Sequence, residues 1–285
     1  MDTWQEEKER QPVYEGFSAP WTEAVYLYCI ARTQGLPCFS GPGVEESHPI
    51  FLHSLGELTA VASYVPAHLF AGPESEKNLQ NPAWVGPRAY RHEALIEYVM
   101  RHVPVLPLPL GTLFTSLERM EERLKRHKEE LVNFLRNISG KAEWSLKGYV
   151  EPEWAQEAIV SRNLAAEEDH LRSLSPGKRY FREKRIREQA KKELSAWTNN
   201  ILDQVVERLR PFGSDFCERG ILSWKATGRH MVSNWAYLIA DAMVEGFHKE
   251  VDHMNAELDK AGMRFELSGP WPPYSFSPAL GDAGP

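Results

Sequence analysis

Hydrophobic residues recur at every second position in several short segments of the chain, which is the pattern of a β-strand with one buried face. Residues 25–30 instead form a continuous apolar run, as expected for a strand inside a sheet. Residues 102–110 hold three prolines and are predicted to be an edge strand or an extended connector. The other predicted strands, of which the first two form a hairpin, are residues 50–52, 58–65, 144–150, 221–226, 233–239 and 263–267.

Helical periodicity is found between these strands. Residues 88–102 and 240–261 place apolar side chains three and four positions apart, as does a long region that follows residue 150. That long region is interrupted by turn residues around 174–177 and ends where a proline and a glycine occur at 211–213. Residues 71–87 contain three prolines and two glycines, so we predict a loop there.

The most regular helical pattern lies between Leu117 and Ile138. Seven residues at alternating steps of three and four form a stripe over three heptads, and the faces between them carry charges of both signs. The stripe fits a single amphipathic helix packed on a sheet as well as it fits a helix paired in a coiled coil. Its members are Leu117, Met120, Leu124, His127, Leu131, Phe134 and Ile138.

From residue 141 onward the predicted order is strand, helix, strand, strand, helix, strand. This is the split βαβ, or ferredoxin-like, arrangement, in which helices cover one face of an antiparallel sheet. We therefore predict an α+β protein of two domains, the second with a long helical or coiled-coil arm. The expected divisions are a disordered lead-in at 1–20, an N-terminal domain at 21–140 ending in the heptad helix, a ferredoxin-like domain at 141–268 and a tail at 269–285.

The composition is that of a globular protein, because 42% of the 285 residues are hydrophobic and 26% are charged. No run of about 18 apolar residues is present, and the first residues are acidic and polar, so we expect neither a membrane span nor a signal peptide. Cys29, Cys38 and Cys217 are odd in number and widely spaced, which fits neither a disulfide framework nor a zinc site. We expect a cytosolic protein.

The formal net charge of −7 argues against general nucleic-acid binding. Residues 178–192 are a local exception, with eight basic residues against two acidic ones. On a helix such a run is typical of a solvated face. It could also meet an acidic partner surface or RNA.

No recognisable catalytic motif is present. The chain has no glycine-rich nucleotide loop and no nucleophile elbow. His248 and His253 are five positions apart, too far round a helix for a shared zinc ion. The acidic residues beside His170 are expected to be solvated, and His92 is expected to be a hydrogen-bonded core histidine. We therefore predict a protein that is not an enzyme and has no cofactor and no metal site.

The segment GPWPPYSF at residues 269–276 combines three prolines with three aromatic residues. Proline fixes its own φ and favours extended backbone before it, so this segment has little conformational entropy left to lose on docking. Two interpretations stay open. The segment either closes the core of its own domain or binds a partner, and in the second case the contact residues are Trp271, Pro272, Pro273, Tyr274 and Phe276.

Five segments of the chain, in the same order, resemble the GvpL/GvpF family of gas vesicle accessory proteins. One departure is Leu110, which stands where the family pattern has a charged or aromatic residue before the glycine. The segments are AVYLYCIA at 24–31, LTAVASYV at 58–65, PAWVGPRAYRHEALIEYVMRHVPVLPLPLGTLF at 82–114, KAEWSLKGYV at 141–150 and GPWPPYSF at 269–276.

The resemblance implies a minor component or assembly factor of the gas vesicle rather than its bulk shell. It implies a cytoplasmic, gas vesicle-associated protein that binds the small apolar shell protein (GvpA-like), limits its aggregation and assists nucleation. Other gas vesicle accessory proteins are further candidate partners. No nucleic acid or membrane partner is expected. The alternatives are a ferredoxin-like nucleic-acid-binding module that uses residues 178–192, and an enzyme domain that binds a small molecule.

Overall fold

The computed structural model describes residues 22–71, 73–221 and 228–279. The lead-in predicted at 1–20 lies outside these residues. The described chain divides into two compact units. The first contains the residues up to Ala142 together with those from Trp271 onward, and the second is Glu143–Pro270. The C-terminal tail therefore belongs to the first unit, although it follows the last strand of the second.

An antiparallel sheet of five strands forms the centre of the first unit. Its order is β2-β3-β1-β4, and β5 also pairs with β1. Every residue of β1 between its two ends is buried, which explains its continuous apolar sequence. The predicted hairpin is confirmed as β2–β3, and the proline-containing segment supplies the edge strand β4. The strands are β1 Glu23–Arg32, β2 Ile50–Leu55, β3 Leu58–Pro66, β4 Val105–Pro107 and β5 Leu113–Phe114.

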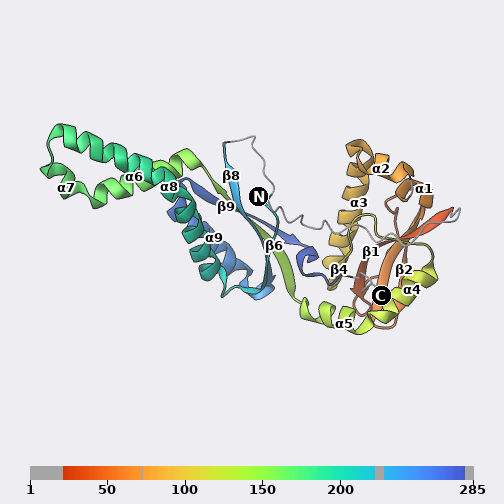
Figure 1. The fold of residues 1–285 in the computed structure, drawn as a ribbon. Coiled ribbons are helices and arrows are strands. Elements are labelled where there is room, and N and C mark those ends of the chain that lie inside the picture. The colour runs from red at the N-terminus through yellow and green to blue at the C-terminus, as the bar shows by residue number, and fades with distance from the viewer. Residues whose placement is uncertain (1–21, 72, 222–227, 280–285) are drawn as a thin grey trace. The chain divides into compact units, whose positions relative to one another are not determined.

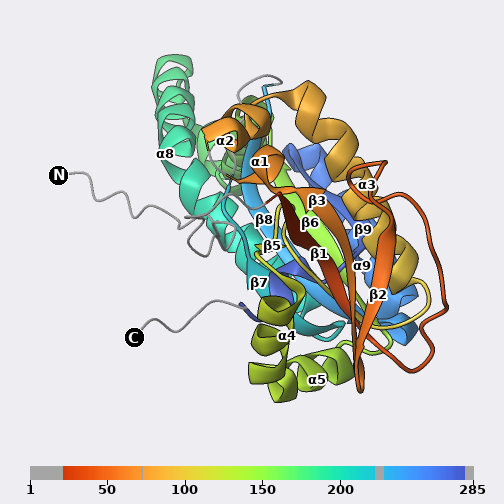
Figure 2. The ribbon, with the colours of Figure 1, turned by 90° about the vertical axis from the view of Figure 1, so that its right-hand side faces the viewer.

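Three helices follow β3: α1 Ala67–Phe70, α2 Pro73–Leu79 and α3 Pro82–Met100. The predicted loop at 71–87 is therefore wrong. Pro82 occupies the start of α3, where its missing N–H has no intrahelical acceptor to lose, and the Asn81 side chain caps the helix by accepting the Ala83 N–H at 3.1 Å. Helix α3 runs along the sheet and packs against β1 and β4 (Figure 2).

The predicted heptad helix is two helices, α4 Leu117–Arg126 and α5 Lys128–Asn137. The break falls at His127, whose φ of −99° and ψ of 11° leave the helical path. His127 is the polar member of the stripe, and its side chain contacts Glu130 at 3.1 Å instead of joining the core. The break also shifts the buried face of α5, so that Leu135 is buried and Phe134 is only partly buried.

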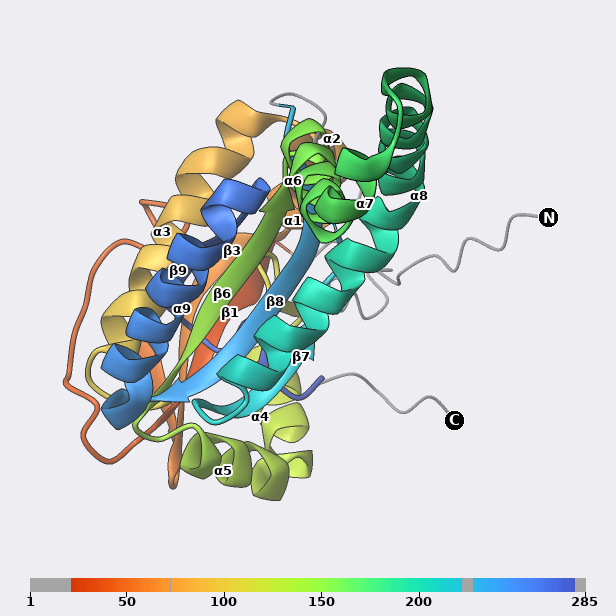
Figure 3. The same cartoon turned by 90° about the vertical axis from the view of Figure 1, so that its left-hand side faces the viewer.

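The second unit contains a four-stranded sheet in the order β7-β8-β6-β9. Helices α8 and α9 lie across the same face of this sheet (Figure 3). Their apolar side chains pack on the alternating residues of the strands, including Leu146, Trp235 and Phe265. The strands are β6 Lys141–Val150, β7 Gly213–Glu218, β8 His230–Ala240 and β9 Met263–Trp271.

The helices of this unit include a projecting arm (Figure 1). The arm is formed by α6 Pro152–Ala166, α7 Glu168–Ser173 and the first half of α8 Pro176–Leu209. Helix α8 has 34 residues, and the second half of it lies on the sheet through Val205 and Leu209. The break predicted around 174–177 is confirmed between α7 and α8. Helix α9 spans Val244–Leu258 and is flanked by single 3₁₀ turns.

One predicted strand, residues 221–226, lies almost wholly outside the described residues. Within the described part of the chain, β8 pairs on one side with β7, which the sequence analysis did not predict. Strand β7 is an edge strand and mostly exposed, so its polar sequence shows no alternation. No helix in the described ranges is long and apolar enough to cross a membrane.

Gly269, the first residue of the GPWPPYSF segment, has a φ of +147°. A Cβ at this position would lie 3.0 Å from the Glu143 carbonyl oxygen and 2.9 Å from the Trp144 ring. Both the backbone conformation and the close approach require glycine here.

We expect Gly269→Ala to lower the free energy of unfolding by about 1–3 kcal/mol, because alanine brings both strain and a steric clash. Urea denaturation followed by circular dichroism measures this change. Gly177→Ala is the matched control, since Gly177 lies in α8 with no atom near its would-be Cβ, and it should be neutral or slightly stabilising. If Gly269→Ala and Gly177→Ala change the free energy of unfolding equally, position 269 does not require glycine.

Candidate functional site: the docked C-terminal tail

A buried hydrogen-bond network is centred on His92 of α3. The Tyr26 hydroxyl lies 2.9 Å from His92 Nδ1, and His92 Nε2 lies 3.0 Å from the Leu108 carbonyl oxygen. Because a carbonyl can only accept, Nε2 carries the proton and Nδ1 accepts from Tyr26. The Gly111 N–H in turn donates to the Tyr26 oxygen at 3.1 Å. Both nitrogens of a neutral histidine are thus paired.

The environment favours this neutral form. Burial lowers the pKa of His92 to about 4, although its hydrogen bond to Leu108 acts in the opposite direction. Burial also raises the pKa of Tyr26. The Tyr28 ring stacks on His92 with 5.6 Å between centroids. The network therefore holds uncharged groups together at neutral pH, as the sequence predicted for a core histidine.

Tyr274 of the tail reaches the same turn of α3. Its hydroxyl donates to Glu93 Oε1 at 2.7 Å and lies 3.4 Å from His92 Nε2. Its ring packs against the apolar core of the first unit. Burial raises the pKa of the Glu93 carboxyl group, and the hydrogen bond from Tyr274 partly offsets that rise. We call this arrangement of Tyr26, His92, Glu93 and Tyr274 the tail clasp.

The five residues predicted to bind a partner have different environments. Pro272 and Pro273 are buried, while Tyr274 and Phe276 are partly buried in a single 3₁₀ turn. The turn is closed by the Ser277 hydroxyl, which donates to the Pro273 carbonyl oxygen at 2.9 Å. Trp271 is 41% exposed. Partner binding by these residues stays a prediction, and the structure adds that the segment is docked on its own chain.

Sequence reasoning did not assign a role to Tyr26, Glu93 or Gly111. The signal that points to them is their position, since they lie within the motif segments 24–31 and 82–114, and Tyr274 lies within 269–276. The clasp therefore joins side chains from three of the five motif segments.

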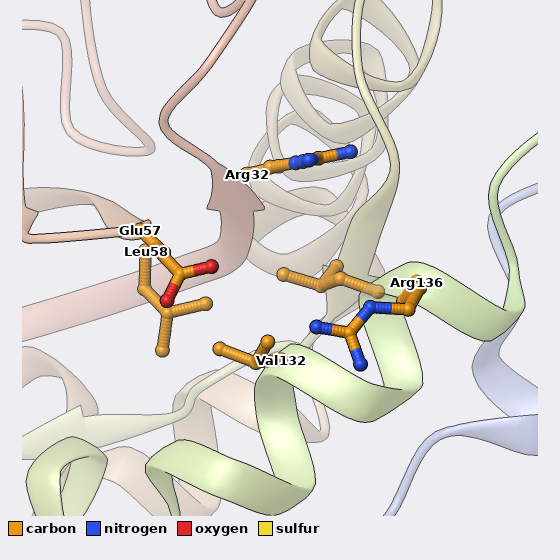
Figure 4. Close-up of a pocket in the computed structure, with 6 residues that line it drawn as sticks. Arg32, Glu57, Leu58, Val132 and Arg136 are labelled. Atoms are coloured by element: carbon orange, nitrogen blue, oxygen red, sulfur yellow. The ribbon is translucent and has the colours of Figure 1, made fainter.

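One pocket, lined by Arg32, Glu57, Leu58 and Arg136 among others, has a volume of about 20 Å³ (Figure 4). That volume holds about one water molecule. No group of three or more histidine, cysteine or carboxylate side chains suited to a metal ion occurs within the described ranges.

A family model described as "Gas vesicle synthesis protein GvpL/GvpF" matches residues 24–278. The chain belongs to this family. Gas vesicle protein L of Streptomyces sp. (strain CB03234) is 29% identical over 259 residues, which cover 88% of this chain and 92% of the relative. Gas vesicle protein L1 of Halobacterium salinarum is 22% identical over 270 residues, or 90% of this chain and 91% of the relative.

Two crystal structures share the fold of this GvpL/GvpF family member. Gas vesicle protein GvpF from Anabaena sp. PCC7120 superposes with a TM-score of 0.64 at 18% identity, covering 90% of this chain and 99% of that one. GvpF from Microcystis aeruginosa gives a TM-score of 0.62 at 19% identity with the same coverage. The mixed α/β architecture with two antiparallel sheets is therefore that of GvpF.

We expect Tyr274→Phe to lower the free energy of unfolding by about 1–3 kcal/mol, because it leaves the partly buried Glu93 carboxyl group without its hydrogen-bond donor. Tyr90→Phe is the control, since Tyr90 is 76% exposed on the same helix, and its effect should stay within about 0.5 kcal/mol. Chemical denaturation of both variants tests this. If Tyr274→Phe is as stable as the wild type, the hydrogen bond from Tyr274 to Glu93 does not stabilise the fold.

Stability should fall as the pH drops from about 6.5 to about 4. The unfolded His92 has an ordinary pKa near 6.5, so in this window the unfolded chain binds more protons than the folded one. The His92 contribution is complete above pH 6.5, and about 2 kcal/mol of it is lost at pH 5.

Unfolding of the wild type and of His92→Gln, measured between pH 4.5 and 7, isolates this contribution. Glu93 has a raised pKa and adds a slope of opposite sign in both proteins, so the difference between them reports His92. The variant should be less stable at pH 7 and show a weaker loss on acidification. Parallel pH profiles would contradict the buried neutral histidine.

Proposed function

We propose that this GvpL/GvpF family member binds the small apolar shell protein of the gas vesicle, limits its aggregation and assists nucleation of the shell. A shell subunit that faces gas exposes a large apolar patch before it polymerises, and such patches aggregate in water. A partner that covers the patch until the subunit joins a shell prevents this. The observation that carries the proposal is the docked tail, which holds an aromatic segment in one conformation.

Within the tail we propose a division of roles. Pro272, Pro273 and Tyr274 hold the segment on the first unit, and Phe276 supports the turn. Trp271 supplies the partner contact, because 41% of its surface is exposed on a backbone that is already fixed. A fixed aromatic anchor loses little entropy on binding, and tryptophan is the residue most enriched at binding hot spots.

We also propose that the second unit is a ferredoxin-like domain with a helical insertion. Its elements follow in the order strand, helices, strand, strand, helix, strand. Its sheet order of β7-β8-β6-β9 puts the first and third of these strands in the centre, as the split βαβ arrangement requires. The arm is then the enlarged first crossover connection of that fold.

Co-expression with the small shell protein tests the proposed function. The wild type should keep the shell protein in the supernatant after centrifugation and elute with it on size exclusion. Trp271→Ala should weaken this binding about tenfold or more, because it removes the anchor. Tyr90→Ala removes an exposed aromatic side chain elsewhere in the first unit and should have no effect.

A shell protein that pellets in the presence of the folded wild type would overturn the chaperone-like function. Binding that is retained by Trp271→Ala would overturn only the assignment of the anchor. Circular dichroism of each variant confirms that it is folded.

A further inference from the structure

Two outer faces of the arm carry large apolar side chains that are exposed. Phe181, Trp154 and Tyr180 have 71%, 63% and 62% of their surface exposed, more than any other large apolar side chain in the described ranges except Tyr90. Trp154 lies at the base of the arm, in the first turn of α6. Tyr180 and Phe181 lie at its tip, near the start of α8 (Figure 1).

The outer face of α8 is also basic. The inner face carries the buried Ile186 and Ala190, of which Ala190 packs against α6, while Tyr180, Phe181, Lys184 and Arg185 are exposed. We call these four residues the basic ridge. Within the described ranges, Lys184 and Arg185 form no ion pair.

Three arginines in the arm's part of α8, Arg179, Arg182 and Arg187, form ion pairs within the arm. Arg182 pairs with Glu167 of the α6–α7 junction, and Arg187 pairs with Glu157 of α6 at 2.9 Å. Lys178, Lys191 and Lys192 of the same helix are also exposed and form no ion pair among the described residues, so the unpaired positive charge of α8 extends beyond the ridge. In a chain of net charge −7, this local excess of positive charge would attract an acidic surface.

The outer face of α6 borders a groove of about 620 Å³. Its α6 wall consists of Glu153, Trp154, Glu157, Ala158 and Ser161, and the end of α9 with its following 3₁₀ turn forms the opposite wall. We call this the acidic groove. Glu153 forms no ion pair among the described residues, and the pair of Glu157 with Arg187 is exposed on both sides, where such pairs contribute little.

The backbone beneath Trp154 is held firmly. The Glu151 N–H donates to the Gly262 carbonyl oxygen at 2.8 Å. Gly262 has a φ of +68°, and a Cβ there would lie 2.7 Å from the Trp154 Cβ. The start of α6 is therefore packed as closely as glycine allows, which fixes the position of an exposed indole at the rim of the groove.

We propose that two copies of this chain associate through their arms, side by side and antiparallel, so that the basic ridge of each copy lies in the acidic groove of the other. An antiparallel pair places the tip of each arm against the base of its partner. It therefore forms the same contact twice about a two-fold axis, which is the commonest symmetry of homodimers. Tyr180 and Phe181 enter the groove beside the partner's Trp154, and Lys184 and Arg185 meet the partner's Glu153 and Glu157.

The observations favour a second copy over a polyanion or a lipid surface. The two complementary faces occur in the same unit of one chain, the ridge on α8 and the groove along α6, with aromatic residues on both. Nucleic acid or a membrane surface would use the ridge, including its aromatic residues, and leave Trp154 and the acidic groove without a role. This pairing does not depend on the proposed binding of the shell protein.

Sedimentation velocity of the full-length chain at low salt tests the pairing. The wild type should form a dimer with a dissociation constant of about micromolar order, and added salt should weaken it. Lys184→Glu/Arg185→Glu and Glu153→Lys/Glu157→Lys should each raise the dissociation constant by about 30-fold or more, because like charges then face each other in both contacts. Lys77→Glu/Lys128→Glu makes the same change in net charge as the first of these at two exposed positions of the first unit, outside the arm and the groove, and should dimerise as the wild type does.

Mixing the two charge-reversed variants gives the sharpest result. In a mixed dimer, the native ridge of one variant meets the native groove of the other. The second contact joins the reversed, acidic ridge to the reversed, basic groove, so both contacts are attractive and association should be restored. Tyr180→Ala/Phe181→Ala should weaken dimerisation without removing its salt dependence. A wild type that stays monomeric at about 100 μM would overturn the proposal, since at a micromolar dissociation constant it would be mostly dimer. A mixture that fails to associate, or a mass that grows beyond the dimer, would also overturn it.

Discussion

The hydrogen bonds around His92 are the constraint on which the first unit depends. A buried polar group destabilises the fold unless it has a partner, so Tyr26, His92 and the Leu108 carbonyl must come together at the same time. Tyr274 joins this centre by its bond to Glu93, across 181 positions of sequence. The network ties the first strand, the long helix, the proline-rich connector and the tail into one unit.

This tie makes the second unit an insertion in the chain of the first. The chain leaves the first unit after Ala142 and returns to it at Trp271, so the first unit contains both early and late residues. The tail therefore docks only after the whole of the second unit has been synthesised. The stiffness of the proline-rich segment reduces the entropy lost in this late step.

The arm shows how charge can be divided on a single helix. Inward-facing cations such as Arg182 pair with carboxylates of the neighbouring helices, which helps to hold a projection that buries few apolar residues. Outward-facing cations such as Lys184 and Arg185 are exposed and form no ion pair among the described residues. In the sequence, residues 178–192 read as one basic run. Only their positions around the helix separate the paired cations from the unpaired ones.

The sequence by itself determined most strands, the break before α8 and the family, because these follow from short-range periodicity and local motifs. The prediction from sequence was wrong where local and tertiary effects conflict. The prolines at 73 and 82 begin helices rather than a loop, and His127 divides a regular heptad stripe into two helices. Strand β7 gave no periodic signal because it lies exposed at the sheet edge. Only the tertiary structure decided that Tyr274 docks beside His92 and Glu93, since no sequence spacing encodes a contact between segments that distant. The exposure of Trp271, Trp154 and Phe181 was decided in the same way, by what packs around each side chain.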